Sequence, residues 1–326
     1  MSKVLVIGNG FDIALGLRSK YSDYINVMSG TSKNAFWPFR DLPKGKFSDC
    51  SLERHFYDYF HPNLTDNSDI EKEFYHVMWI DVEAELLNYV RTKIGKPIDA
   101  DLAMADEHSF NNLKMMLQKY ISVMPTIEPK SPETYIIALL EAIKTDGCFD
   151  KAYSFNYTDL ENELIRFAKF NDTALPKIVN VHHTPSNDNP FNIVLGINED
   201  TSIPKEYRFL FKSMQTEPTD LAQDLANADE VIFYGLSFGE IDFPYFKAFF
   251  ELVSTQSILS SKKHITIFTF GKDGVDAIWD RLHEIGVLIH TLKERSYFSI
   301  IDVNNIKLPG YDETAFKGLI NRLESK

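Results

Sequence analysis

The feature of this sequence that most constrains its fold is a series of apolar runs, rich in Val, Ile, Phe and Tyr, that alternate with helix-like patterns. Most of these runs are continuous, which is typical of strands buried on both faces of a sheet. Strands that alternate with helices predict an α/β fold with a doubly wound, mainly parallel sheet. The expected strands are 3–7, 151–155, 177–182, 191–195, 229–234 and 263–270, and the expected helices are 11–28, 158–169, 205–213, 218–227, 242–255, 272–284 and 312–324.

Residues 30–147 hold almost no strand-like run, so we interpret them as a helical insertion in a core formed by 1–29 and 148–326. A continuous apolar run such as VLVI in strand 3–7 is typical of a buried interior strand, so we expect this strand at the centre of the sheet. We expect the insertion to cover the carboxyl ends of the strands. Helical patterns within the insertion lie near 51–60, 70–94, 106–124 and 132–145.

Charge and cysteine content exclude several classes of function. A formal net charge of −13 argues against an extensive nucleic-acid surface or an anionic membrane as partner, although a small nucleotide pocket remains compatible with it. Cys50 and Cys148 stand apart without a CxxC pattern, so we expect neither a disulfide framework nor a metal site. The chain shows no signal peptide and no apolar run near the ~18 residues of a membrane-spanning helix, which predicts a cytoplasmic protein.

The first expected strand ends in a glycine-rich turn, VLVIGNGFD at 4–12, and a helical pattern follows. Such a turn directs backbone N–H groups and the positive end of a helix dipole at one point, which favours a phosphate. Only Gly8 and Gly10 of a GxGxxG pattern are present, so a tight turn with Asp12 as helix cap explains the stretch equally well. A carboxylate at Asp12 would repel a pyrophosphate unless it turned away, were protonated or were bridged by a cation, and it could instead bind ribose.

Three further strands are expected to end in polar clusters. Because the carboxyl ends of parallel strands share one edge of a sheet, where ligands bind, we expect the four strand-end loops to converge on one site. Each polar residue also has a local explanation, as a helix cap or a hydrogen-bonded strand end. The three clusters are Asn156 with Asp159, His182, and Gly235 with Ser237 and Asp242.

Taken together, these stretches resemble the AbiH family of bacterial phage abortive-infection proteins, on the segments 5–24, 79–86, 155–164, 179–188 and 233–246. That family is in turn similar to sirtuin-like NAD-binding proteins, which implies a Rossmann-like fold, a role in antiviral defence and NAD as ligand or substrate. The resemblance matches Gly8 and Gly10, Gly16 with Leu17, Asn156 with Tyr157, His182, Gly235 and Ser237 to sirtuin signatures. We therefore expect His182 and Asn156 to be catalytic and Gly8, Asn9, Gly10, Asp12, Asp159, Gly235, Ser237 and Asp242 to bind the nucleotide.

The chain departs from the sirtuin pattern at Asp12, Arg18 and His183, and the paired CxxC motifs of a sirtuin zinc site are absent, which argues against protein deacetylation. Cleaving the bond between nicotinamide and ribose needs a base that works near neutral pH, and a histidine pKa of ~6.5 suits that role. We thus expect an NAD(P) glycohydrolase in which His182 is the base and Asn156 orients ribose or water. His183 should point to the opposite face of its strand and take no part.

Two alternatives remain open. In the first, the protein is a non-catalytic sensor whose helical insertion binds a phage-derived trigger or a partner chain, and a homo-oligomer is compatible with this. In the second, GLSFG at 235–239 is a nucleophile elbow and the protein is a serine hydrolase using Ser237 and His290. Finally, Trp79 and Glu83 in WIDVEAELLNYV share one helical face, which is most typical of core packing with solvated carboxylates, or of a lid that carries Asp81 and Glu83.

Overall fold

The computed structural model describes residues 2–20, 51–60, 82–123, 133–143, 149–168, 176–182, 193–215, 218–257, 261–306 and 313–324. The chain divides into two compact units. The sheet unit comprises Met1–Leu17, Pro129–Thr184 and Thr219–Lys326, and the helical unit comprises Arg18–Glu128 and Pro185–Pro218. Among the described residues, 133–143 belong to the sheet unit and 193–215 belong to the helical unit.

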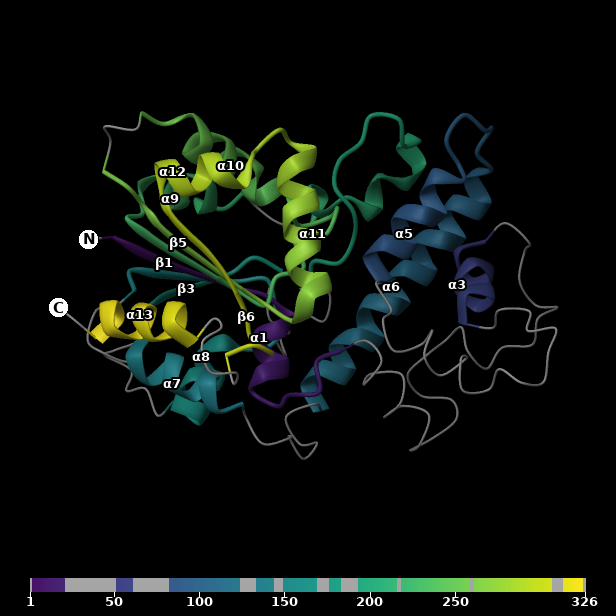
Figure 1. Cartoon of the computed structure of the whole chain (residues 1–326). Helices are drawn as coiled ribbons and strands as arrows, with labels where there is room; N and C mark the ends of the chain where they lie inside the picture. The colour runs from purple at the N-terminus through teal and green to yellow at the C-terminus, as the bar shows by residue number, and fades with distance from the viewer. Residues whose placement is uncertain are drawn as a thin grey trace, which may run out of the picture. The chain divides into compact units, whose positions relative to one another are not determined.

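The sheet unit is built on six parallel strands in the order β3-β2-β1-β4-β5-β6 (Figure 1). Strand β1 lies inside the sheet, where Val6 stands opposite Tyr153 on one side and Phe233 on the other. The expected parallel α/β sheet with strand 3–7 in its interior is therefore confirmed. The strands are β1 (Lys3–Ile7), β2 (Lys151–Ser154), β3 (Lys177–Asn180), β4 (Glu230–Tyr234), β5 (His264–Thr269) and β6 (Tyr297–Asp302).

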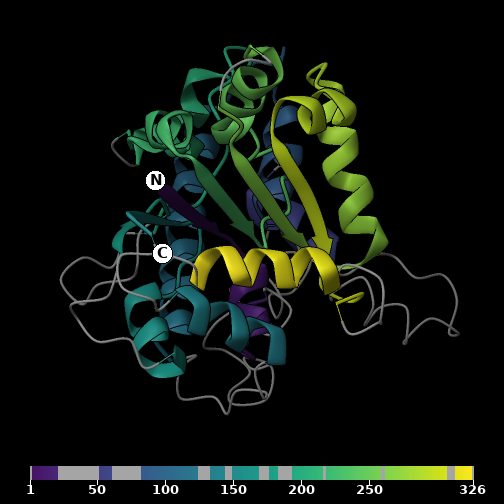
Figure 2. The ribbon, with the colours of Figure 1, turned by 60° about the vertical axis from the view of Figure 1, so that its left-hand side comes forward.

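Both faces of this sheet are covered, as its continuous apolar strands require. Successive side chains of β1 enter two different cores: Leu5 and Ile7 pack with one set of helices, and Val4 and Val6 pack with the other. Figure 2 shows the sheet between these two layers. The first layer holds α1 (Asn9–Ala14), α7 (Thr134–Ile143), α8 (Leu160–Ala168) and α13 (Glu313–Glu324), and the second holds α9 (Leu221–Asn227), α10 (Pro244–Thr255), α11 (Gly271–Glu284) and α12 (Ile289–Arg295).

The described elements differ from the expected ones in several places. The helix expected at 11–28 is shorter in its described part, where α1 ends at Ala14. Gly16 follows with a φ of +85°, a left-handed conformation that is typical of helix ends. The described part of 191–195 is not a sheet strand; its residues are buried in the helical unit, where Ile197 and Phe211 form an isolated parallel bridge. Strand β6 was not expected. It is an edge strand, and its sequence YFSIID interrupts the apolar residues with Ser299, so it lacks a continuous apolar run.

The helical unit is held together around a buried carboxylate. Asp106, which is 1% exposed, accepts hydrogen bonds from the backbone N–H of Leu52 (2.8 Å), from the Tyr207 hydroxyl (2.9 Å) and from the Tyr89 hydroxyl. Three helices and the segment at 205–210 therefore meet at one side chain. The elements are α3 (Leu52–Phe60), α5 (Val82–Arg91), α6 (Ala100–Val123) and the short 3₁₀ helices η3 (Lys205–Leu210) and η4 (Lys212–Met214), where an α-helix at 205–213 was expected.

Among the described helices of both units, none combines the length and the apolar content that crossing a membrane would require.

Candidate functional site

The strand order of the sheet reverses between β1 and β4, which places a topological switch point there. In open α/β sheets, ligands bind in the crevice outside the carboxyl ends of the strands at such a point. The four polar loops follow β3, β2, β1 and β4, which are consecutive neighbours in the sheet and run parallel. The carboxyl ends of these four strands therefore lie at one edge of the sheet, and each of the four loops begins there.

The glycines of the first and fourth loops pack against each other. The N–H of Gly8 donates to the carbonyl of Tyr234 and the N–H of Gly10 donates to the carbonyl of Gly235, both at 2.9 Å. A Cβ atom on residue 10 would lie only 2.6 Å from the Cα of Gly235, which itself has a φ of +67°. These glycines therefore permit close backbone contact between β1 and β4, and their two amide groups are committed to β4 rather than free for a phosphate.

Asp12 lies within α1 and does not cap it, because the helix begins at Asn9. Its side chain is 1% exposed and binds the loop after β2: Asn156 Nδ2 donates to Oδ1 and Thr158 Oγ1 donates to Oδ2, each at 2.8 Å. Burial raises the pKa of Asp12 to about 7, these two hydrogen bonds oppose that rise, and the nearby Glu163 carboxylate adds to it. The carboxylate that would have repelled a pyrophosphate is turned into the protein.

Asn156 and Asp159 belong to the same loop but are used differently. The Asn156 side chain is 4% exposed, and its Oδ1 is buried without a hydrogen-bond partner. Asp159 caps α8, accepting from the backbone N–H of Asn162 at 3.2 Å, so the local explanation applies to it. Thr158 and Glu163 were not predicted as site residues, although Thr158 stands in the NYTD stretch at 156–159.

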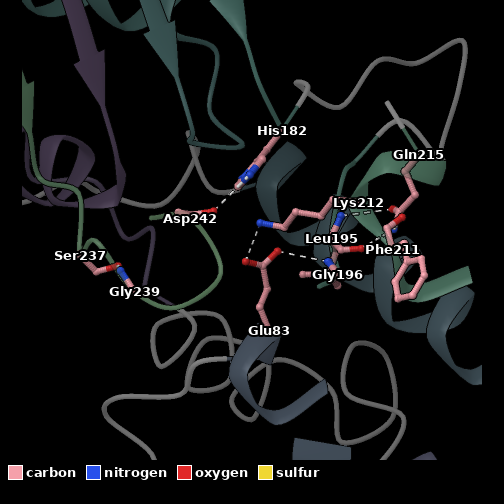
Figure 3. A network of polar contacts seen from close by, with 10 residues as sticks. All are labelled: Glu83, His182, Leu195, Gly196, Phe211, Lys212, Gln215, Ser237, Gly239 and Asp242. Atoms are coloured by element: carbon pink, nitrogen blue, oxygen red, sulfur yellow. Dashed lines mark hydrogen bonds and ion pairs between the residues drawn. The ribbon is translucent and has the colours of Figure 1, made fainter. Parts of the chain in front are cut away.

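His182 and Asp242 face each other across the edge, with His182 Nε2 3.6 Å from Asp242 Oδ1 (Figure 3). This is within ion-pair range and slightly longer than a hydrogen bond. Aromatic rings hold the imidazole in place: the Phe155 ring centroid lies 5.3 Å away in an edge contact, and the Tyr157 ring centroid lies 5.8 Å away. Both residues were expected in the site, but their pairing could not be read from the sequence.

Ser237 and His290, in contrast, are not brought together. Ser237 is exposed after the carboxyl end of β4, and its Oγ accepts a local hydrogen bond from the N–H of Gly239 at 3.3 Å (Figure 3). His290 lies on α12, which leads into the amino end of β6. Helix α10 also begins only at Pro244, whereas a nucleophile elbow opens directly into its helix.

A comparison with family models identifies the relatives of this chain. The model described as "Bacteriophage abortive infection AbiH" matches residues 4–262. The chain belongs to the AbiH family. No curated protein matches it. In this AbiH protein the matched segment runs from β1 to the residues just before β5, so it includes all four loops of the switch-point edge.

The described residues of this AbiH protein contain no group of three or more His, Cys, Asp or Glu side chains that could hold a metal ion. Cys50, Cys148 and His183 lie outside the described residues, as do Trp79 and Asp81 of the expected lid.

The helical unit of the AbiH protein has its own buried polar network. Glu83, expected to be solvated, is 8% exposed; its Oε2 lies 2.9 Å from Lys212 Nζ, and its Oε1 accepts from the N–H of Gly196 at 3.2 Å (Figure 3). Gln215 donates to the carbonyl of Leu195 at 2.7 Å and accepts from Lys114 Nζ at 2.8 Å. Burial lowers the pKa of Lys114 to about 8. These contacts fasten residues 193–215 to α5 and α6, which is a structural role.

Proposed function

We propose that this AbiH protein is an abortive-infection effector that binds a nucleotide at the switch-point edge of its sheet and hydrolyses NAD or a related dinucleotide. The observation that carries the proposal is the contact between His182 and Asp242. Their strands, β3 and β4, are three positions apart, which is about 14 Å at the usual strand spacing. The two loops therefore reach over the ends of β2 and β1 to place a histidine and a carboxylate together at the crevice.

A histidine beside a carboxylate suits general-base catalysis. The carboxylate beside Nε2 orients the imidazole and stabilises the imidazolium that forms when the ring takes up a proton. Catalytic contacts in ligand-free proteins are often slightly long and tighten when substrate binds, which fits the 3.6 Å separation. The aromatic rings of Phe155 and Tyr157 hold the imidazole in a largely dry environment.

The proposed reaction is hydrolysis of the bond between nicotinamide and ribose. Water attacks the anomeric carbon, the carbon–nitrogen bond breaks with its electron pair going to the pyridinium nitrogen, and neutral nicotinamide leaves. His182 takes the proton of the attacking water. The products are nicotinamide and ADP-ribose, and the proton passes from His182 to solvent. Asn156, whose Oδ1 has no partner, would accept a hydrogen bond from the water or from a ribose hydroxyl.

A specific observation also favours the non-catalytic alternative. His182 and Asn156 are 3% and 4% exposed, so a ligand reaches them only after the loops at this edge move. A sensor that opens when a phage-derived trigger or partner binds would show the same burial. An effector that is closed until infection would show it too, so the two proposals differ in turnover and not in structure.

The deciding experiment measures release of nicotinamide from NAD by the purified protein, with and without extract from phage-infected cells. We expect turnover in the triggered wild type and a rate about 10²–10⁴-fold lower in His182→Gln, the usual value of a positioned base. Gln is preferred to Ala because His182 is packed between aromatic rings. His290→Gln is the matched control and should retain the wild-type rate. A triggered wild type that turns over no dinucleotide would establish the sensor instead.

A further inference from the structure

Asp12 and Asn156 form a buried pair that joins α1 to the loop after β2. Asn156 directs its Nδ2 at Asp12 Oδ1 and leaves its own Oδ1 buried without a partner. The other carboxylate oxygen of Asp12 is occupied by the Thr158 hydroxyl. The Asn156 amide is thus satisfied on one side only.

We infer that Asp12 is the positioning residue for Asn156. When Asp12 is ionised, it holds the amide so that Asn156 Oδ1 can accept a hydrogen bond from a hydroxyl or N–H group of the ligand. When Asp12 is protonated, the amide can reverse, and that acceptor is withdrawn. The part of this inference that concerns the ligand rests on the proposed function. The part that concerns the amide does not.

Hydrogen-bond counting supports two discrete arrangements. While Asp12 is ionised, a reversed amide would set Asn156 Oδ1 against the carboxylate, where two acceptors repel each other. Once Asp12 Oδ1 carries a proton, it can donate to Asn156 Oδ1, and Nδ2 then takes the place that Oδ1 held, so each arrangement leaves one amide group available. Thr158 goes on donating to Asp12 Oδ2 in both arrangements.

The charges around the pair place this change near neutral pH. Burial raises the pKa of Asp12 to about 7, and Glu163 on α8 contributes to that rise. Burial raises the pKa of Glu163, Arg166 opposes that rise, and Asp159 adds to it. Helix α1, which carries Asp12, contains no other charged residue.

The ligand group at position 156 is therefore a donor at pH 8. If only the ionised form binds this group, a pKa near 7 makes NAD affinity about tenfold higher at pH 8 than at pH 6. The coupling is reciprocal, so a bound donor at Asn156 should lower the pKa of Asp12.

The test follows the side-chain amide signals of Asn156 by NMR in the full chain, labelled with ¹⁵N at asparagine and ¹³C at aspartate carboxyls. We expect the Asn156 amide signals and the Asp12 carboxyl signal to shift together with one midpoint near pH 7. Glu163→Gln, which leaves the pair itself intact, should lower that midpoint. In Asp12→Asn, the Asn156 signals should not titrate near pH 7.

A second measurement, of NAD affinity at pH 6 and pH 8, separates this inference from the proposed function. Titrating amide signals with no NAD binding at either pH would uphold the positioning role and refute the nucleotide. Asn156 signals that stay fixed while the Asp12 carboxyl titrates would overturn the inference, because Thr158 would then be accepting the proton. Equal NAD affinity at both pH values would overturn the role of the acceptor in binding.

Discussion

Asp12 is a buried carboxylate whose two oxygens both accept hydrogen bonds from the loop after β2. In the structure it turns away from the edge toward Asn156 and Thr158, and its pKa lies close to neutral. Its partners are 144 and 146 residues distant in the chain, and strand-end spacing does not reveal which side chains meet.

The raised pKa of Asp12 makes stability depend on pH. Since the folded pKa of about 7 exceeds the unfolded value of ~3.9, the stabilisation is present at low pH and is lost as the pH rises through 7. Between pH 5 and pH 8, wild type should lose about 3 kcal/mol of unfolding free energy relative to Asp12→Asn. Urea unfolding at the two pH values measures this difference. Asp280→Asn, at an exposed position, is the control. If the difference in unfolding free energy between wild type and Asp12→Asn were the same at both pH values, the account would be contradicted.

The turns after β1 and β4 pack closely against each other through Gly10 and Gly235. In the sequence, the glycines after β1 indicated a phosphate site or a tight turn. In the structure, they allow the two backbones to come into contact. The sequence could not show this, because the pattern of one loop carries no information about the neighbour that the sheet places beside it.

Gly235→Ala should therefore be among the most destabilising alanine substitutions in the sheet unit. A Cβ atom there would lie 2.4 Å from Phe11 N, in addition to the strain at a φ of +67°. Gly286 is a matched control, since it has a φ of +75° and nothing within 4 Å of an added Cβ. We expect Gly286→Ala to cost about 1–2 kcal/mol and Gly235→Ala about 1–3 kcal/mol more, measured by urea unfolding. Equal costs would show that the turns can separate.

The buried pair of Glu83 and Lys212 should dominate the attachment of residues 193–215 to α5. Because Lys212 is 2% exposed, Glu83→Gln removes the carboxylate that pairs with a buried ammonium group and should cost about 3–5 kcal/mol. The double variant Glu83→Gln/Lys212→Met should recover most of that loss. Glu251→Gln, which breaks the exposed pair with Lys247, should cost under about 0.5 kcal/mol in the same unfolding assay. A double variant as unstable as the single one would argue against the charge as the cause.

Across the whole molecule, the alternation of apolar runs and helices was enough to predict the parallel sheet, its central strand and the edge where four polar loops gather. An apolar run indicates burial but not strand formation, which explains why the strand expected at 191–195 was wrong. Strand β6 was missed because an edge strand lacks the continuous apolar run on which the prediction relied. That the expected insertion covers the crevice stays a prediction.

The most direct test of the central claim is the NAD content of cells that express this AbiH protein, followed through phage infection. We predict that NAD falls after infection in cells with the wild type, together with phage yield, and stays constant in cells with His182→Gln at equal protein level. Protection from phage by the wild type with NAD unchanged would contradict the claim that the switch-point edge is a nucleotide-hydrolysing site.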